Sequence, residues 1–189
     1  SETNIRDGNG VLAALPVPDA AAVDPAVTFD SADLATMINA DATVNLDPEG
    51  IAVASDGGFW IASEGAGTVA EATTRPITSH NLVVKVDASG TIERVITLPA
   101  DLNDVQLRFG FEGIAEADGK LVVAFQRAWN GDANPRLGIY DLGNDSWSFV
   151  FYPLDTVASP NGGWVGLSDI AALGNGSFLV VERDNQAGP

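Results

Sequence analysis

Cysteine is absent from this chain of 189 residues, and histidine occurs only once. The lack of cysteine excludes disulfides, zinc-thiolate sites, iron–sulfur clusters and cysteine nucleophiles. A Ser-His-Asp triad would have to use the single His80, and no G-x-S-x-G motif is present to supply its nucleophile. A surface loop is the better interpretation of His80.

Basic residues are also scarce, because 9 Lys and Arg face 26 Asp and Glu, for a formal net charge of -17. Such a chain repels nucleic acid and anionic membranes, and it concentrates cations near its surface. No apolar run approaches the roughly 20 residues of a membrane-spanning helix. With 46% hydrophobic and 19% charged residues, the composition is that of a globular protein. We therefore expect no nucleic-acid partner and no membrane span.

The chain changes character at Asp47. Residues 1–46 are rich in Ala, Asp and Pro, with one expected helix at 31–40. From residue 47 to 189, β-branched and aromatic runs are separated by turn pairs such as Asp118-Gly119, which predicts an all-β structure. The expected strands lie near 51–55, 58–63, 82–87, 91–97, 113–116, 120–126, 136–141, 146–152 and 177–182.

One hairpin motif occurs three times: "EGIAVASDGGFWIASEG" from Glu49, "EGIAEADGKLVVAFQR" from Glu112 and "SDIAALGNGSFLVVERD" from Ser168. A second hairpin follows each of the first two copies, so each unit has four antiparallel strands. Repeated four-stranded units are typical of a β-propeller, and this chain supplies roughly two and a half of its blades. Residues 1–46 then belong to a preceding blade. Because about four to eight blades are needed for closure, we expect the remaining ones in another chain or in a continuation of this one.

Polar residues stand at the ends of the repeated hairpin, where its two strands meet. Glu49 is paired with Glu64, Glu112 with Gln126, and Ser168 with Glu182, while Arg127 and Arg183 follow. In a propeller these groups would converge on one mouth of the central channel. Crowded carboxylates repel one another unless a cation compensates, and an oxygen-rich site suits Ca²⁺. The alternative is that the acidic groups only cap turns or pair with arginines.

The three motifs closely resemble the phytase-like family, whose members are often named "esterase-like activity of phytase", from about Asp47 to Asp184. The resemblance implies a six-bladed β-propeller in an exported bacterial protein, periplasmic or extracellular, with a small phosphoester as substrate. The second motif usually ends in a glutamate, whereas this chain has Gln126 there, which weakens a strict ring of carboxylates.

Two functions remain open. The first is a Ca²⁺-dependent phosphoester hydrolase with an unassigned general base. Its expected metal ligands are Glu49, Glu64, Glu112, Asp169 and Glu182, and its expected substrate-binding residues are Arg108, Gln126, Arg127 and Arg183. The second is a non-catalytic propeller that binds a ligand or a protein at the channel mouth, with calcium as a structural pin. Ion pairing with the glutamates is the alternative role of the arginines.

Overall fold

The computed structural model describes residues 4–6, 12–14, 45–129, 131–159 and 162–186. The described part consists of antiparallel β-strands and one short helix, α2 (Ala100–Asn103). The all-β prediction is therefore confirmed, whereas the helix expected at 31–40 lies outside the described residues. Near the start of the chain, β1 (Asn4–Arg6) pairs with β2 (Leu12–Ala14). Within the described residues, no helix has the length and apolar character that crossing a membrane requires.

Most strands belong to two four-stranded sheets and a hairpin. The first sheet has the order β3-β4-β5-β6, the second has the order β10-β9-β8-β7, and the third hairpin pairs β11 with β12. Their bounds are Pro48–Val53 (β3), Phe59–Ser63 (β4), Leu82–Val86 (β5), Ile92–Thr97 (β6), Phe111–Ala117 (β7), Lys120–Phe125 (β8), Arg136–Asp141 (β9), Ser146–Phe151 (β10), Val165–Gly174 (β11) and Ser177–Asp184 (β12). The division into two hairpins per unit agrees with the repeats in the sequence.

Strand β11 is missing from the expected strand ranges, although the third hairpin motif, from Ser168, implied a strand there. Its sequence, "VGLSDIAALG", has few β-branched residues, so local propensity gives a weak signal. Its pairing with β12 supplies the ladder that propensity does not predict. The turn between them has the backbone that a tight hairpin requires, with positive φ angles at Asn175 (52°) and Gly176 (71°).

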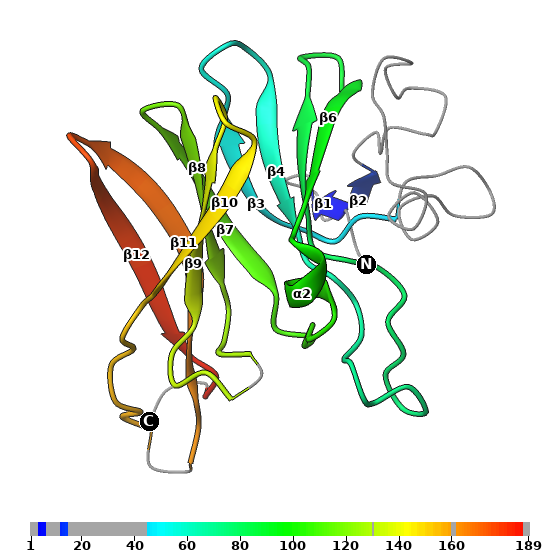
Figure 1. Cartoon of the computed structure of the whole chain (residues 1–189), viewed down its shortest axis with the longest axis vertical. Helices are drawn as coiled ribbons and strands as arrows, with labels where there is room; N and C mark the ends of the chain where they lie inside the picture. Colours follow the sequence, from blue (N-terminus) through cyan, green and yellow to red (C-terminus); the bar gives the residue numbers. More distant parts are fainter. Residues whose placement is uncertain (1–3, 7–11, 15–44, 130, 160–161, 187–189) are drawn as a thin grey trace.

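The first strands of the three units, β3, β7 and β11, lie next to one another, and the sheets follow side by side (Figure 1). Glycines permit this approach. A Cβ on Gly50 would lie 2.6 Å from the carbonyl oxygen of Glu112, and a Cβ on Gly113 would lie 2.6 Å from the amide nitrogen of Ile170. A side chain at either position would push neighbouring strands apart. At the matching position of β11 the chain has Asp169.

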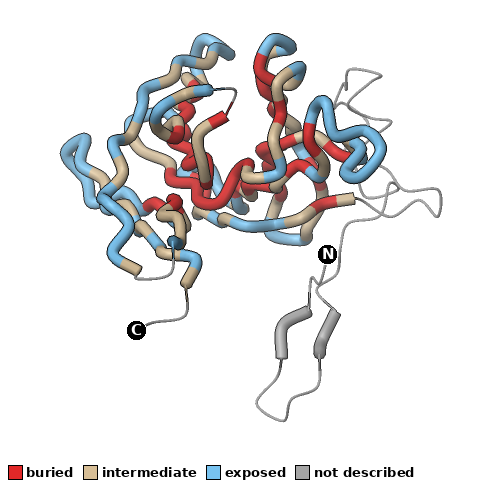
Figure 2. The backbone as a smooth tube through the Cα atoms, turned by 90° about the horizontal axis from the view of Figure 1, so that it is seen from below, coloured by how far each residue is buried: buried red, intermediate tan, exposed pale blue. Residues whose placement is uncertain are grey.

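Two apolar layers join the units. Between the first and second sheets lies a core that includes Trp60, Phe111, Phe125 and Trp129, each at most 3% exposed. A second core, between the second sheet and the third hairpin, includes the fully buried Leu167. The buried segments concentrate where the units meet, while loops at the periphery are exposed (Figure 2). Each large buried side chain stabilises this packing by roughly 1.5–3 kcal/mol, which fixes the strand ends that carry the polar residues.

Candidate functional site

The three first strands share one irregularity. The antiparallel register of each strand skips one residue near its start, which is the mark of a β-bulge. A bulge leaves the extra residue outside the ladder and re-aims its side chain. The skipped residues are Glu49 on β3, Glu112 on β7 and Ser168 on β11. The first residue of every repeated motif is therefore a bulge residue.

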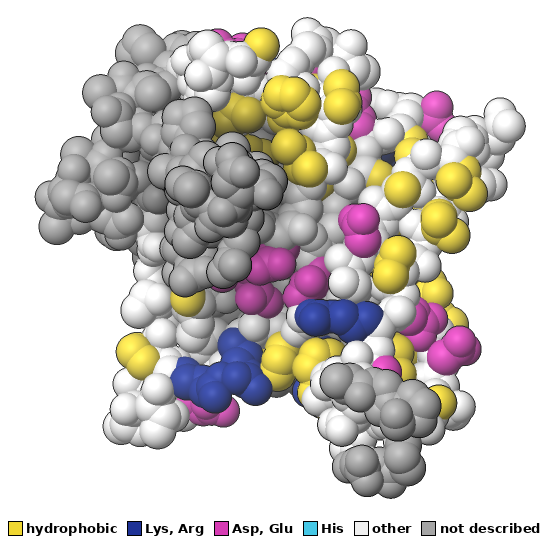
Figure 3. Space-filling view, turned by 180° about the vertical axis from the view of Figure 1, so that it is seen from behind, with side chains coloured by type: hydrophobic (Ala, Val, Ile, Leu, Met, Phe, Trp, Pro, Cys, Tyr) yellow, Lys and Arg dark blue, Asp and Glu magenta, His cyan; other side chains and the backbone are white. Residues whose placement is uncertain are grey.

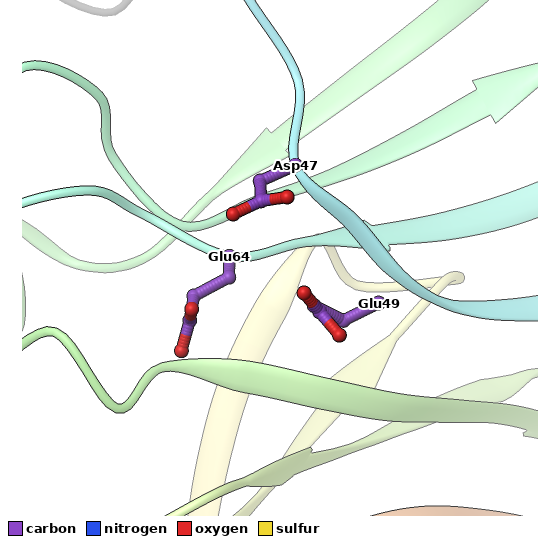
Figure 4. Close-up of side chains that lie close together, drawn as sticks. All are labelled: Asp47, Glu49 and Glu64. Carbon is purple, nitrogen blue, oxygen red and sulfur yellow. The ribbon is translucent and has the colours of Figure 1, made fainter. Parts of the chain in front are cut away.

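Around the first bulge, three carboxylates converge. Asp47 precedes β3, Glu49 lies in its bulge, and Glu64 follows β4 (Figure 4). One oxygen from each carboxylate lies within 4.8 Å of the others. The backbone holds two of them together, because the amide of Glu64 donates a 2.8 Å hydrogen bond to the carbonyl of Asp47. Two oxygens bound to one Ca²⁺ at its usual bond lengths lie at most about 5 Å apart, so the spacing fits this ion.

Two glutamates of the cluster have raised pKa values. Burial, with smaller contributions from the charges of Glu112, Glu49 and Asp47, raises the pKa of Glu64 to about 8, although the hydrogen bond donated by the Gly110 amide acts against this shift. Burial, together with the charge of Asp47, also raises the pKa of Glu49 despite the nearby Arg183. A bound cation would favour the ionised form of both groups.

Glu112 lies beside the cluster and is buried, with 6% of its surface exposed. The side-chain amide of Gln126 donates a hydrogen bond to it, and the guanidinium of Arg183 lies 3.9 Å away. Burial and the charge of Glu49 raise the pKa of Glu112 to about 7, although Arg183 and Gln126 act against this shift. At neutral pH this carboxyl group is therefore poised between its two protonation states.

Arg108 and Arg127 differ from the other described basic side chains. Among the described residues, neither makes an ion pair, whereas six other basic groups have a carboxylate oxygen at 3.9 Å or less. Those six are Arg75, Lys85, Arg94, Lys120, Arg136 and Arg183. In a chain with so many carboxylates, two arginines without such a partner leave their charge available to another anion.

Aromatic rings hold these two arginines in place. The guanidinium of Arg108 lies 4.3 Å from the ring centre of Phe109, and that of Arg127 lies 5.0 Å from the same ring and 4.6 Å from Trp164. The two rings meet edge to face at 5.5 Å. Cation–π contacts of this kind fix a guanidinium while its N–H groups stay available as donors.

Acidic and basic groups line one shared hollow of about 550 Å³. Asp47, Glu64 and Gln126 contribute to its wall, and so do Arg75, Arg108 and Phe109. On this face of the molecule, acidic side chains gather at the centre with basic side chains close by (Figure 3). Oxygen ligands for a cation and donors for an anion thus open to the same space.

A buried amide network positions the loop that carries Arg108. Asn81 is fully buried, and its side-chain oxygen accepts hydrogen bonds from the amides of Gly65 (3.0 Å) and Phe111 (2.9 Å). Its side-chain nitrogen donates to Gln106. The backbone amide of Gly110, the residue before Phe111, donates a 2.8 Å hydrogen bond to the carboxylate of Glu64. Asn81 therefore ties the end of β4 to the start of β7, where the acidic and basic groups meet.

The structure brings together most of the residues that the sequence suggested. Glu49, Glu64 and Glu112 lie close to one another, with Gln126 and Arg183 at Glu112. Arg108 and Arg127 share Phe109.

Two acidic residues stand apart. Pairing Ser168 with Glu182 at the hairpin end was wrong by one residue, because the register places Arg183 where the other units have Glu64 and Gln126. Both carboxylate oxygens of Glu182 instead accept hydrogen bonds, one from the hydroxyl of Tyr152 (3.0 Å) and one from the amide of Asp155 (2.9 Å). Asp169 is exposed, accepts a hydrogen bond from the amide of Ile170, and does not belong to the three-carboxylate group.

Sequence reasoning missed Asp47, Asn81 and Phe109. The signal for Asp47 was its place two residues before Glu49, since residues two apart along an extended chain point to the same side. Asn81 had no pattern to mark it, because its role depends on three segments that are distant in the sequence. Phe109 lies next to Arg108, but only the fold brings Arg127 and Trp164 to its ring.

Comparison with known proteins gave one match. A family model described as "Phytase-like: Esterase-like activity of phytase" matches residues 5–189. The searches of curated proteins and of solved structures found no match.

Proposed function

The chain belongs to the phytase-like family, and on this premise we propose that it is a Ca²⁺-dependent phosphoester hydrolase built on a β-propeller. The observation that carries the proposal is the pairing of two unlike groups around one hollow. Asp47 and Glu64 of the three-carboxylate cluster line the hollow together with Arg108, and Arg127 lies against the same Phe109 ring as Arg108. Neither arginine makes an ion pair among the described residues. A phosphoester needs both, a cation to offset its charge and donors to orient its oxygens.

Asp47, Glu49 and Glu64 are the residues that would hold Ca²⁺. Their donors are all carboxylate oxygens, which this hard cation prefers, and their spacing admits a common ion. When bound, Ca²⁺ would supply Lewis-acid polarisation of the phosphoryl group. Glu112 is a further carboxylate beside this group, and its buried position suits a residue that exchanges a proton near neutral pH.

Arg108 and Arg127 would orient the substrate. Phe109 and Trp164 restrict both side chains, so less conformational entropy is lost when they bind a phosphoryl group. Arg183 instead pairs with a glutamate, since its guanidinium lies 3.9 Å from the carboxylate of Glu112. It would moderate the repulsion between Glu112 and Glu49 rather than contact substrate.

A propeller would support this arrangement. Adjacent first strands with equivalent bulges, each beginning a sheet that leads away from the site, are what radial blades would provide. Six blades and an exported protein, periplasmic or extracellular, follow from the family resemblance and are part of the proposal.

The test is hydrolysis of a small chromogenic phosphomonoester, measured after EDTA treatment and again after Ca²⁺ is restored. We expect activity only with Ca²⁺, and a rise in melting temperature, since a ligand of the folded state stabilises it by about 2.7 kcal/mol at one hundred times its Kd. A rise in melting temperature without turnover of any phosphoester would support the alternative, a non-catalytic module stabilised by calcium. The absence of both the activity and the rise in melting temperature would reject the metal site.

A further inference from the structure

The hollow of about 550 Å³ beside the carboxylates is larger than a phosphoryl group needs. Cavities of roughly 300–1,000 Å³ hold whole small molecules, usually against apolar side chains with a few polar groups that orient the ligand. Besides its charged residues, the hollow is lined by Ala66, Pro76 and Phe109. Hydrophobic side chains lie next to basic ones on the face drawn in Figure 3. The organic part of a phosphoester therefore has a place in the hollow, against apolar groups.

The loop between β4 and β5 builds part of this wall, and hydrogen bonds hold it in place. The amide of Thr78 donates a 3.0 Å hydrogen bond to the carbonyl of Ala66, so the two sides of the loop are joined. The hydroxyl of Thr68 accepts a 3.2 Å hydrogen bond from the amide of Arg108, which attaches the loop to the segment before β7. Because the wall and the arginine are already positioned, little conformational entropy is lost when a ligand binds.

Arg108 offers two different surfaces to such a ligand. The N–H groups of a guanidinium lie in its plane and donate to phosphoryl oxygens, while its flat faces stack on aromatic rings. Among the described residues, Phe109 is the one ring with a cation–π contact to Arg108, at 4.3 Å. Arg108 is exposed, which leaves room for a ring of the ligand on the opposite face. The same side chain can thus contact both the phosphoryl group and an aromatic group attached to it.

The charges around the hollow limit the ligand to one phosphoryl group. A phosphomonoester carries about two negative charges near pH 7, and Arg108 and Arg127 supply two positive charges that no ion pair uses among the described residues. Arg75 also lines the hollow, but Glu71 lies 3.9 Å from it. Two carboxylates of the cluster line the same hollow, and the chain has a net charge of -17. A second phosphoryl group would therefore be repelled.

From these features we infer that the hollow binds the leaving group of the substrate, and that the substrate is a phosphomonoester with one phosphoryl group on an aromatic ring. The inference rests on the proposed function for its chemistry. The N–H groups of Arg108 and Arg127 bind the phosphoryl oxygens, and the ring lies between Arg108 and the apolar wall. Hydrolysis joins the hydroxyl group of water to phosphorus and breaks the bond from phosphorus to the ring oxygen. That oxygen takes the other proton of water, so inorganic phosphate and a phenol are released.

Phosphonates, which resist hydrolysis, test this binding apart from turnover. Methylphosphonate, cyclohexylphosphonate and phenylphosphonate are titrated into the full chain with Ca²⁺ and followed by calorimetry. We expect phenylphosphonate to bind about fivefold more tightly than cyclohexylphosphonate, because only the flat ring stacks on a guanidinium. A wall that acted through apolar contact alone would bind cyclohexylphosphonate at least as tightly. That result, equal affinity for all three compounds, or no binding of any would overturn the inference.

A fourth compound tests the limit of one phosphoryl group. 1,4-Phenylenebisphosphonate has the same ring with a second phosphonate, and we expect it to bind more weakly than phenylphosphonate because carboxylates line the hollow. Equal or tighter binding would overturn the limit. The proposed function is tested separately, by turnover. Phosphoester hydrolysis without a preference for the phenyl group would retain the hydrolase and reject the leaving-group site.

Two alanines of the same loop provide matched variants. Ala66→Leu fills the hollow from its wall, whereas Ala72 is also exposed but does not line the hollow. We expect Ala66→Leu to weaken phenylphosphonate binding by about tenfold through steric conflict, and to leave methylphosphonate binding at the parent level. Ala72→Leu should change neither affinity. Equal losses in the two variants would show that the ring does not lie at this wall.

Arg108→Lys tests the stacking itself. Lysine keeps the charge but has no flat face, so the ratio of phenylphosphonate to cyclohexylphosphonate affinity should fall to about one. Using the ratio removes the loss of phosphoryl binding that both compounds share. A parent-level ratio in Arg108→Lys would overturn the placement of the ring on this arginine.

Discussion

Where the first and second sheets meet, the described charged side chains are paired at one end of the strands and mostly unpaired at the other. At the end with the hairpin turns, Lys85 bridges Asp56 (2.9 Å) and Glu93 (3.0 Å), and Arg94 pairs with Asp145 (2.5 Å). At the end with the bulges, Asp47, Glu49 and Glu64 crowd together, while Arg108 and Arg127 make no ion pair among the described residues.

The difference separates structural charges from those available to a ligand. Glu116, at the turn end, has its oxygens occupied by the backbone amide and hydroxyl of Ser55 and by the indole of Trp60. The bulge end uses the same residue types, but Glu49 and Glu64 have raised pKa values there. Keeping unsatisfied charge lowers stability, so its presence in one place is expected where a ligand completes the network.

The largest effect should come from breaking the bulge end. Glu49→Gln removes one expected ligand and leaves the fold intact, because Glu49 lies outside the ladder and part of its surface is exposed. We expect Ca²⁺ affinity and hydrolysis to fall by about 100-fold, the scale seen when groups around a metal are altered. Isothermal calorimetry and steady-state kinetics measure the two quantities.

The matched control for that change is Glu93→Gln, an equally conservative change at the turn end. Glu93 contacts Lys85 rather than the cluster, so Ca²⁺ affinity and hydrolysis should stay at the parent level. Equal losses of Ca²⁺ affinity and hydrolysis in Glu49→Gln and Glu93→Gln would show that the bulge end and the turn end do not differ in function.

Breaking the turn end should cost stability instead. Lys85 has 8% of its side chain exposed, and Lys85→Met leaves Asp56 and Glu93 without their cation. Because both carboxylates are partly exposed, we expect a loss of about 1–2 kcal/mol in the free energy of unfolding, with unchanged Ca²⁺ affinity. Urea denaturation reports the loss. An unchanged midpoint would show that these pairs contribute nothing measurable.

A pH titration should distinguish the ends without any substitution. The folded-state pKa values of Glu64 (about 8) and Glu112 (about 7) lie above the ordinary glutamate value of 4.5. The folded state therefore binds more protons than the unfolded state between pH 4.5 and 8, and these groups' contribution to stability falls as pH rises through that window. We expect the fall to be reduced in Glu64→Gln. Saturating Ca²⁺ should reverse it, because the ion binds the ionised form.

Much of this arrangement could be predicted from sequence because it repeats. The turn pairs marked the hairpins, and the repeated first residue marked Glu49 and Glu112 before their bulges were seen. The third copy failed at Glu182, since counting from the hairpin ends cannot show which residue of a bulged strand lacks a partner.

What the sequence could not supply are contacts made by distant segments. Asn81 joins residues 65, 106 and 111, and each of those contacts depends on packing rather than on a local pattern. The same holds for the arginines, whose charges could pair with many carboxylates in this acidic chain. Only the fold shows that Arg183 lies at Glu112 while Arg108 and Arg127 lie against rings.

The smallest effect should come from exchanging the arginine at the hollow. Arg108→Lys keeps the charge but loses the planar fork, which can donate two parallel hydrogen bonds to a phosphoryl group. We expect KM for a phosphomonoester to rise by roughly five- to tenfold, about 1–1.4 kcal/mol of binding, with little change in kcat or Ca²⁺ affinity. Arg136→Lys, at a residue paired with Asp132, provides the control and should leave KM unchanged. If Arg108→Lys had the KM of the parent while Arg136→Lys did not, the paired arginines would be the ones that bind substrate, and the contrast between the two ends would have to be drawn elsewhere.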